Sequence, residues 1–137
     1  MRVGHDPIIL NAAAAFVRND SGQVLLLRRA DRKEEVWGLP GGMMEVGESA
    51  EETMRREVQE ESGLQVVVDR FLGVYTKDRL DTYPNGDRAH VILFVFVCHP
   101  CGGVLRVDSA EAAELRYFDP GGVPSTIRHQ DILRDYL

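Results

Sequence analysis

Apolar residues along this chain fall into short runs separated by turn-forming residues, and one stretch has a helical pattern. Residues 8–17 form an apolar run rich in alanine, and residues 24–27 form a second apolar run. Between the two runs stands Asn19-Asp20-Ser21-Gly22, whose residue types supply the chemistry of a tight turn. The pattern therefore predicts a strand, a tight turn and a second strand.

The helical pattern covers residues 50–62. Apolar residues recur there with the spacing i, i+4 and i+8 of one helix face: Ala50, Met54 and Val58. Ser49 is suited to cap the first turn while Glu52 reaches back to it in a capping box. Gly63 is suited to end the helix in the left-handed conformation that other residues resist. We expect the apolar face of this helix to pack against the body of the domain.

The second half of the chain has the pattern of a β-rich region. Residues 65–76 and 88–98 favour strands, and between them Tyr83-Pro84-Asn85-Gly86-Asp87 contains Asn-Gly, a strong hairpin signal. Residues 104–107 and 115–118 predict further short strands. Strands on both sides of a central acidic helix favour an α/β fold in which helices enclose a mixed sheet.

A terminal amphipathic helix is expected over residues 126–137, with Ile127, Leu133 and Leu137 on one side. The 137 residues suit a single domain spanning 1–137, and a hydrophobic content of 44% is ordinary for a globular core. The longest apolar run, residues 91–98, has the length of a strand rather than of a membrane span. The first ten residues lack a signal-peptide core, so we expect a cytoplasmic location.

A net charge of −6 disfavours nucleic acid and anionic membranes as partners, because their phosphates would repel the protein. Cys98 and Cys101 form the motif C-H-P-C, which is similar to thiol redox motifs. The two cysteines follow a predicted strand and precede Gly102-Gly103. We therefore expect them to be incidental turn residues, with a redox or metal function as the less favoured alternative.

Three carboxylates lie at one edge of the predicted helix. Each residue advances about 100° around a helix, so Glu57, Glu60 and Glu61 fall within a sector of about 100°. Carboxylates this close repel one another, and Mg²⁺ or Mn²⁺ relieves the repulsion because these cations prefer oxygen ligands. The stretch contains no Cys or His, which argues against zinc. A solvated acidic helix face is the general alternative for a short charge pattern.

Residues 42–64 resemble the Nudix box, the signature of hydrolases that cleave nucleoside diphosphates linked to another group. The signature is a glycine, five residues, a glutamate, seven residues and then R-E-apolar-x-E-E-x-G-apolar, and every specified position is met. The preceding W-G-L-P-G-G is also common in that family. The resemblance implies a Nudix-like α/β/α sandwich with a central mixed β-sheet.

The resemblance also implies roles for residues within the box. The metal ligands would be the three carboxylates, Glu57, Glu60 and Glu61. The main-chain carbonyl of Gly42 often joins them in the family. Arg56 would orient the glutamates by charge pairing, and Glu48 is its expected partner. The implied cofactor is Mg²⁺ or Mn²⁺.

Two questions stay open after the box is placed. The general base in the family is either the glutamate that matches Glu57 or a carboxylate outside the box. Outside candidates are Glu111 and Glu114, for each of which an ordinary surface role is the alternative. The other question is the substrate, because the residues that recognise it lie outside the box in this family.

Candidate substrate-binding residues each have a structural alternative. Arg28 and Arg29, at the end of a predicted strand, either meet phosphates or lie in solvent. Trp37, Tyr75 and Tyr83 either stack on a base or pack in the core. His90 either faces the substrate pocket or has a structural role.

The expected function is metal-dependent hydrolysis of a diphosphate linkage in a small nucleotide, and we favour nucleotide sugars similar to ADP-ribose. The alternatives are a nucleoside triphosphate pyrophosphohydrolase and a nucleotide-binding sensor without turnover. An RNA-end hydrolase is disfavoured by the acidic balance of the chain. Dimers are frequent in the family, so a homodimer is a further expectation.

Overall fold

The computed structural model describes residues 8–30, 36–76, 80–82, 88–107, 112–124 and 130–136. The larger of two sheets has the strand order β4-β1-β7-β5, and β6 pairs with β7 outside this order. Its strands are β1 (Ile8–Val17), β4 (Gly41–Met43), β5 (Leu64–Tyr75), β6 (Leu80–Thr82) and β7 (Arg88–Gly103). Strands β1 and β7 are parallel, whereas the other pairs are antiparallel, so this sheet is mixed.

A smaller antiparallel sheet has the strand order β3-β2-β8. Its strands are β2 (Val24–Arg29), β3 (Trp37–Gly38) and β8 (Ala112–Phe118). The tight turn between β1 and β2 is confirmed: the Asn19 side-chain oxygen accepts the N–H groups of Ser21 and Gln23. Beyond a single bridge between Arg18 and Val24, the two strands separate into different sheets.

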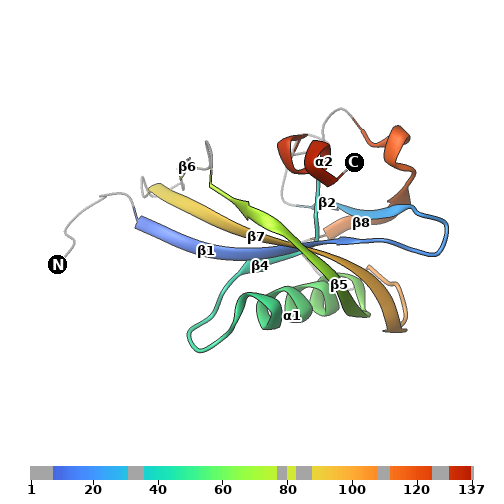
Figure 1. Cartoon of the computed structure of the whole chain (residues 1–137), viewed down its shortest axis with the longest axis horizontal. Helices are drawn as coiled ribbons and strands as arrows, with labels where there is room; N and C mark the ends of the chain where they lie inside the picture. Colours follow the sequence, from blue (N-terminus) through green and yellow to red (C-terminus); the bar gives the residue numbers. More distant parts are fainter. Residues whose placement is uncertain are drawn as a thin grey trace.

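Helices cover both sides of the sheet structure in the described part of the chain. Helix α1 (Ala50–Ser62) and helix α2 (Gln130–Tyr136) lie on opposite sides of the strands (Figure 1). Met54 and Val58 of α1 pack against one sheet face, and Ile132 and Leu133 of α2 belong to the cluster on the other face. The expected α/β sandwich with a mixed sheet is confirmed. Within the described residues, no helix combines the length and the apolar character needed to cross a membrane.

Local sequence signals at both ends of α1 are confirmed. Ser49 caps the helix by accepting the Glu52 N–H at 3.1 Å, and the Glu52 carboxylate accepts the Ser49 N–H at 2.9 Å. Gly63 ends the helix with φ of 79°, a left-handed conformation in which a side chain would be strained. The register of α1, and with it the direction of its carboxylates, is therefore defined by residues within and beside the helix.

The strand expected over residues 104–107 is wrong. Gly103 has φ of 81°, which turns the chain out of β7, and the Arg106 N–H donates to the carbonyl of Ser62 at the end of α1. Val104 is 71% exposed, so its side chain does not join a sheet core. The backbone of this segment caps the helix instead of extending a sheet.

The turn expected around Cys98 and Cys101 is also wrong. Strand β7 continues through both cysteines to Gly103 and pairs with β5, with Cys98 opposite Val68. The Cys98 thiol is buried and lies 3.8 Å from the Met54 sulfur. Burial raises the pKa of Cys98 to about 12, which makes its reactive thiolate scarce at neutral pH.

The expected hairpin turn at residues 83–87 lies outside the described residues. Strands β6 and β7 pair on either side of it, with Thr82 opposite Arg88, as a hairpin requires. In the described part of the terminal helix, Leu133 is buried as expected and so is its neighbour Ile132. Ile127 and Leu137 lie outside the described residues. Strand β8 extends the expected segment 115–118 by three residues at its start.

Candidate active site

Gly41 and Gly42 of strand β4 lie directly against the acidic edge of α1. A Cβ atom placed on Gly42 would lie 2.4 Å from the side-chain carboxyl carbon of Glu57. The neighbouring Gly41 donates its N–H to Glu61 Oε1 at 2.8 Å. Strand β4 positions both glycines by pairing with β1, with Gly42 opposite Ala13. Two of the expected carboxylates therefore meet the main chain of one glycine pair.

These two carboxylates are largely withdrawn from water. The side chain of Glu57 is 15% exposed, and Glu61 is 3% exposed. Ionised carboxylates in such positions need hydrogen bonds or nearby positive charge, because burial disfavours the charged form. Glu60 differs, because its side chain is 58% exposed.

Arg56 supplies positive charge to this edge of α1. Its guanidinium donates to Glu57 Oε1 at 2.8 Å and to Glu60 Oε2 at 3.4 Å through Nη1. It also donates to the Met43 carbonyl at 3.1 Å through Nη2. Because a guanidinium presents its donors in a rigid plane, Arg56 links β4 to the carboxylates of α1 in one orientation.

Glu48 holds Arg56 in place, as the sequence predicted. Nε and Nη2 of Arg56 donate to the two Glu48 carboxylate oxygens at 2.7 and 2.9 Å, the bidentate geometry of a strong pair. The Glu45 N–H and the Thr53 hydroxyl also donate to Glu48, each at 2.9 Å. These hydrogen bonds, of which those from Arg56 are the largest cause, lower the pKa of Glu48 from 4.5 to about 2.

This lowered pKa predicts how stability depends on pH. Protonation of Glu48 is harder in the folded protein, so its contribution is complete above pH 4.5 and is lost as the pH falls toward 2. Urea unfolding measured between pH 7 and pH 2 should show the free energy of unfolding falling in that window. Glu48→Gln should lower stability at pH 7 and flatten the decline. Equal slopes for the two proteins would contradict the assignment.

The carboxylates of Glu57, Glu60 and Glu61 are not arranged around one common metal position. Within the part of the chain that the structure describes, no three acidic, imidazole or thiol side chains are grouped so that they could hold a metal ion as they stand. Glu57 and Glu61 face the glycine pair, while Glu60 is directed to Arg56. The donors in reach are hard oxygens, which suit a cation of the Mg²⁺ or Mn²⁺ type.

The described candidate residues outside the Nudix box lie on different strands. Arg28 lies on β2 and Glu114 on β8, where they face each other at 3.6 Å. Arg116 approaches Glu114 at 3.8 Å, so this carboxylate lies between two guanidinium groups. Arg29 follows Arg28 at the end of β2 and is half-buried. Residues 28 and 114 are therefore brought together, which their distance along the chain did not indicate.

Trp37 is a core residue. It is 1% exposed, and its ring packs edge-on against Phe118 with centroids 4.9 Å apart. The guanidinium of Arg116 lies 5.3 Å from the Trp37 ring centroid. This placement leaves almost no surface of the indole for stacking on a base, and it corresponds to the core-packing alternative.

The remaining sequence candidates are His90, Tyr83 and Glu111. His90 lies on β7 opposite Leu80 of β6, with its Nε2 atom 2.7 Å from the Thr76 carbonyl. That contact joins the histidine to the residue that follows β5. Tyr83 and Glu111 lie outside the described residues.

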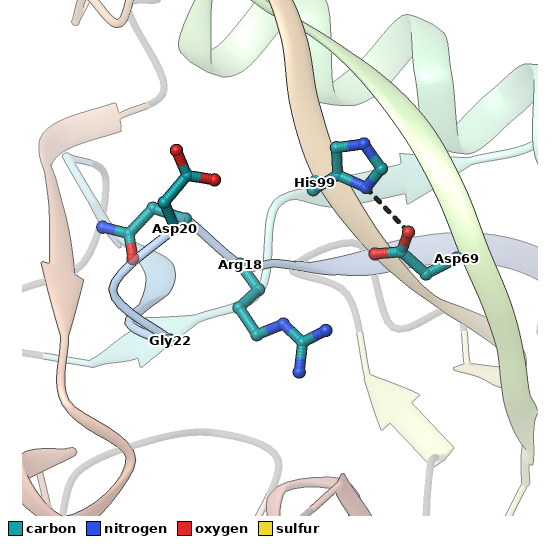
Figure 2. Close-up of a pocket in the computed structure, with 6 residues that line it drawn as sticks. Arg18, Asp20, Gly22, Asp69 and His99 are labelled. Atoms are coloured by element: carbon teal, nitrogen blue, oxygen red, sulfur yellow. Dashed lines mark hydrogen bonds and ion pairs between the residues drawn. The ribbon is translucent and has the colours of Figure 1, made fainter.

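A polar pocket that the sequence did not indicate lies beside the β1–β2 turn. It has a volume of about 400 Å³ and is lined by Arg18, Asn19, Asp20, Gly22, Asp69 and His99. Figure 2 shows His99 of β7 and Asp69 of β5 facing each other, at a distance of 2.7 Å. The Arg18 guanidinium and the Asp20 carboxylate point in different directions, so the charged groups do not converge on one ligand position (Figure 2).

The mixed sheet packs against α1, and the acidic edge of this helix faces the glycine pair of β4. A family model described as the NUDIX domain matches residues 9–136. The chain belongs to the Nudix family and is a hydrolase of its pyrophosphohydrolase type. Enzymes of this family act on small nucleotide substrates.

Named relatives support this membership. The chain is 34% identical over 127 residues to a protein named ADP-ribose pyrophosphatase from Methanocaldococcus jannaschii, covering 92% of this chain and 72% of that one. It is 36% identical over 112 residues to a putative 8-oxo-dGTP diphosphatase from Bacillus subtilis, covering 82% and 68%. A crystal structure of a MutT NUDIX hydrolase from Burkholderia pseudomallei superimposes with a TM-score of 0.74 at 25% identity, covering 94% and 98%.

Proposed function

We propose that this protein hydrolyses a diphosphate linkage in a nucleoside diphosphate derivative, with nucleotide sugars similar to ADP-ribose as the favoured substrates. The observation that carries the hydrolytic site is the contact between the Glu57 carboxylate and the main chain of Gly42. The Glu57 carboxylate lies against Gly42, and the buried Glu61 carboxylate accepts the N–H of the neighbouring Gly41. Together they bring several oxygen atoms to one place beside β4. The relative named ADP-ribose pyrophosphatase supports the choice of substrate.

The proposed metal-binding residues are Glu57, Glu60 and Glu61, with the carbonyl of Gly42. Because Glu60 is exposed, rotation about its side-chain bonds can carry its carboxylate toward the other two without disturbing the core. We propose Mg²⁺ or Mn²⁺ as the cofactor because the donors are all oxygen. When bound, such a cation would polarise the phosphorus and lower the pKa of a coordinated water.

The chain's own residues have positioning and charge-balancing tasks. Arg56 neutralises part of the negative charge on Glu57 and Glu60, and Glu48 fixes the plane of its guanidinium. The Gly41 N–H holds Glu61 by one oxygen. We propose Glu57 rather than Glu114 as the general base, because Glu114 is held by Arg28 and Arg116 on another sheet. Glu111, the other candidate outside the box, lies outside the described residues. Arg28 remains our candidate for a phosphate contact.

The alternative substrate class is a nucleoside triphosphate, which the Bacillus subtilis relative named putative 8-oxo-dGTP diphosphatase supports. A hydrolysis screen with Mg²⁺ separates the two classes. It should include ADP-ribose, other nucleotide sugars, dinucleoside polyphosphates, and ordinary and oxidised triphosphates, with products identified by mass.

We expect metal-dependent release of AMP and ribose 5-phosphate from ADP-ribose at a higher kcat/KM than any triphosphate supports. Addition of EDTA should abolish the reaction. A clear preference for triphosphates would move the assignment to the alternative. Nucleotide binding without turnover of any compound would indicate a sensor.

A further inference from the structure

Two buried hydroxyl groups on α1 are used in different ways. Thr53 and Ser62 are both fully buried. The Ser62 hydroxyl donates to the carbonyl of Val58 one turn back, which is the usual bond of such a side chain within a helix. The Thr53 hydroxyl instead donates to Glu48 Oε1 at 2.9 Å, outside the helix. The buried Thr53 hydroxyl therefore binds a carboxylate outside the helix and not the backbone of its own helix.

Thr53 belongs to a continuous series of hydrogen bonds that ends at the site. Its hydroxyl contacts Glu48, both oxygens of Glu48 accept from Arg56, and Arg56 donates to Glu57 Oε1 at 2.8 Å. Thr53 is fully buried, so its hydroxyl is directed to Glu48 and not to solvent. Among the described residues, the other donors to Glu48 are Arg56 itself and the N–H of the exposed Glu45.

We propose that Thr53 is a positioning residue for the hydrolytic site. Its buried hydroxyl fixes the rotation of the Glu48 carboxylate, and through Arg56 it sets where Glu57 presents its oxygens. The proposal rests on the proposed function, because it assigns Thr53 to the orientation of a metal-binding carboxylate. In this proposal Thr53 acts through Glu48 and Arg56 and makes no contact of its own with the substrate or the cation.

The test compares Thr53→Val with Thr53→Ser. Valine keeps the volume and β-branch of threonine but removes the hydroxyl, whereas serine keeps the hydroxyl but loses a buried methyl group. We expect Thr53→Val to weaken Mn²⁺ binding about fivefold and to lower kcat by about tenfold with little change in KM, as for one charge-assisted hydrogen bond acting through an intermediary. Thr53→Ser should restore both values to within about twofold of wild type, even though the loss of the methyl group lowers its thermal stability.

Mn²⁺ binding is measured by titration with detection of the free ion by electron paramagnetic resonance, independently of turnover. Ser62→Ala is the matched control, since it removes a buried hydroxyl from the same helix without touching Glu48, and it should bind Mn²⁺ as wild type does. Wild-type Mn²⁺ affinity in Thr53→Val, equal weakening in Thr53→Ser, or equal weakening in Ser62→Ala would overturn the proposal. A wild-type protein that binds Mn²⁺ but hydrolyses nothing would contradict the proposed function and leave the binding comparison decisive for Thr53. A wild-type protein that binds no Mn²⁺ would overturn both.

Discussion

Replacing Glu61 with glutamine is expected to lower kcat/KM by about a thousandfold while the protein stays folded. Glutamine has the size of glutamate, and its side-chain oxygen can still accept the Gly41 N–H that Glu61 Oε1 accepts at 2.8 Å. The substitution removes one negative charge at a position that is 3% exposed, so it weakens cation binding without leaving a cavity. A bound metal contributes several kcal/mol to transition-state stabilisation, and each 1.36 kcal/mol corresponds to tenfold in rate.

The measurement is steady-state hydrolysis of the preferred nucleotide, with thermal unfolding recorded for the same samples. Glu51→Gln is the control, because Glu51 lies on the same helix but is exposed and pairs with Arg55. The control should keep its rate within about twofold, as exposed pairs contribute little. A Glu61→Gln protein with more than a tenth of wild-type kcat/KM would remove Glu61 from the metal-binding set.

Gly42→Ala is expected to lower kcat/KM by about a hundredfold, with only a small change in stability. The new Cβ would lie 2.4 Å from the Glu57 carboxyl carbon and 2.6 Å from its Oε1 atom, so the carboxylate must leave its position. Glu57 is a flexible side chain, and its displacement therefore costs the fold little. Misplacing a reacting group by about 1 Å can cost a hundredfold in rate.

Two other glycines make this prediction specific. At Gly38 nothing lies within 4 Å of an added Cβ, so Gly38→Ala should retain activity and stability. At Gly41 the added Cβ would lie 2.4 Å from the Ala13 carbonyl oxygen, which is backbone and cannot yield as a side chain does. Gly41→Ala should therefore lower the melting temperature more than Gly42→Ala does. Activity near the wild-type level in Gly42→Ala would show that Glu57 works from a different position.

Helix α1 and its chemistry followed from the sequence because their causes are local. Ser49, Glu52 and Gly63 act on backbone groups within one turn of the helix ends, and the glutamate spacing determines which side chains share an edge. The pairing of Glu48 with Arg56 also followed, since the resemblance to the Nudix box implied that contact. The metal-binding roles of Glu57, Glu60 and Glu61 stay predictions that the variants above test.

Strand partners and burial depended on distant parts of the chain. The apolar runs before and after Asn19 indicated two strands, but only long-range pairing separated them into the mixed sheet and the smaller sheet. The segment 104–107 has the composition of a strand, yet its backbone had a nearer partner in the end of α1. The composition of a segment indicates which secondary structures it can form, and the hydrogen-bond partners available in the fold determine which one it forms.

The sequence by itself determined the family, the hydrolase class and the acidic helix, while its candidate site residues stay predictions. Tertiary structure decided that Gly42 touches Glu57, that Trp37 lies in the core, that Arg28 faces Glu114, and that the Thr53 hydroxyl leaves its helix for Glu48. The physical reason is range. Capping, helical spacing and turn chemistry depend on residues a few positions apart and can be recognised along the chain. Contacts between distant segments depend on which strands pair in the folded protein.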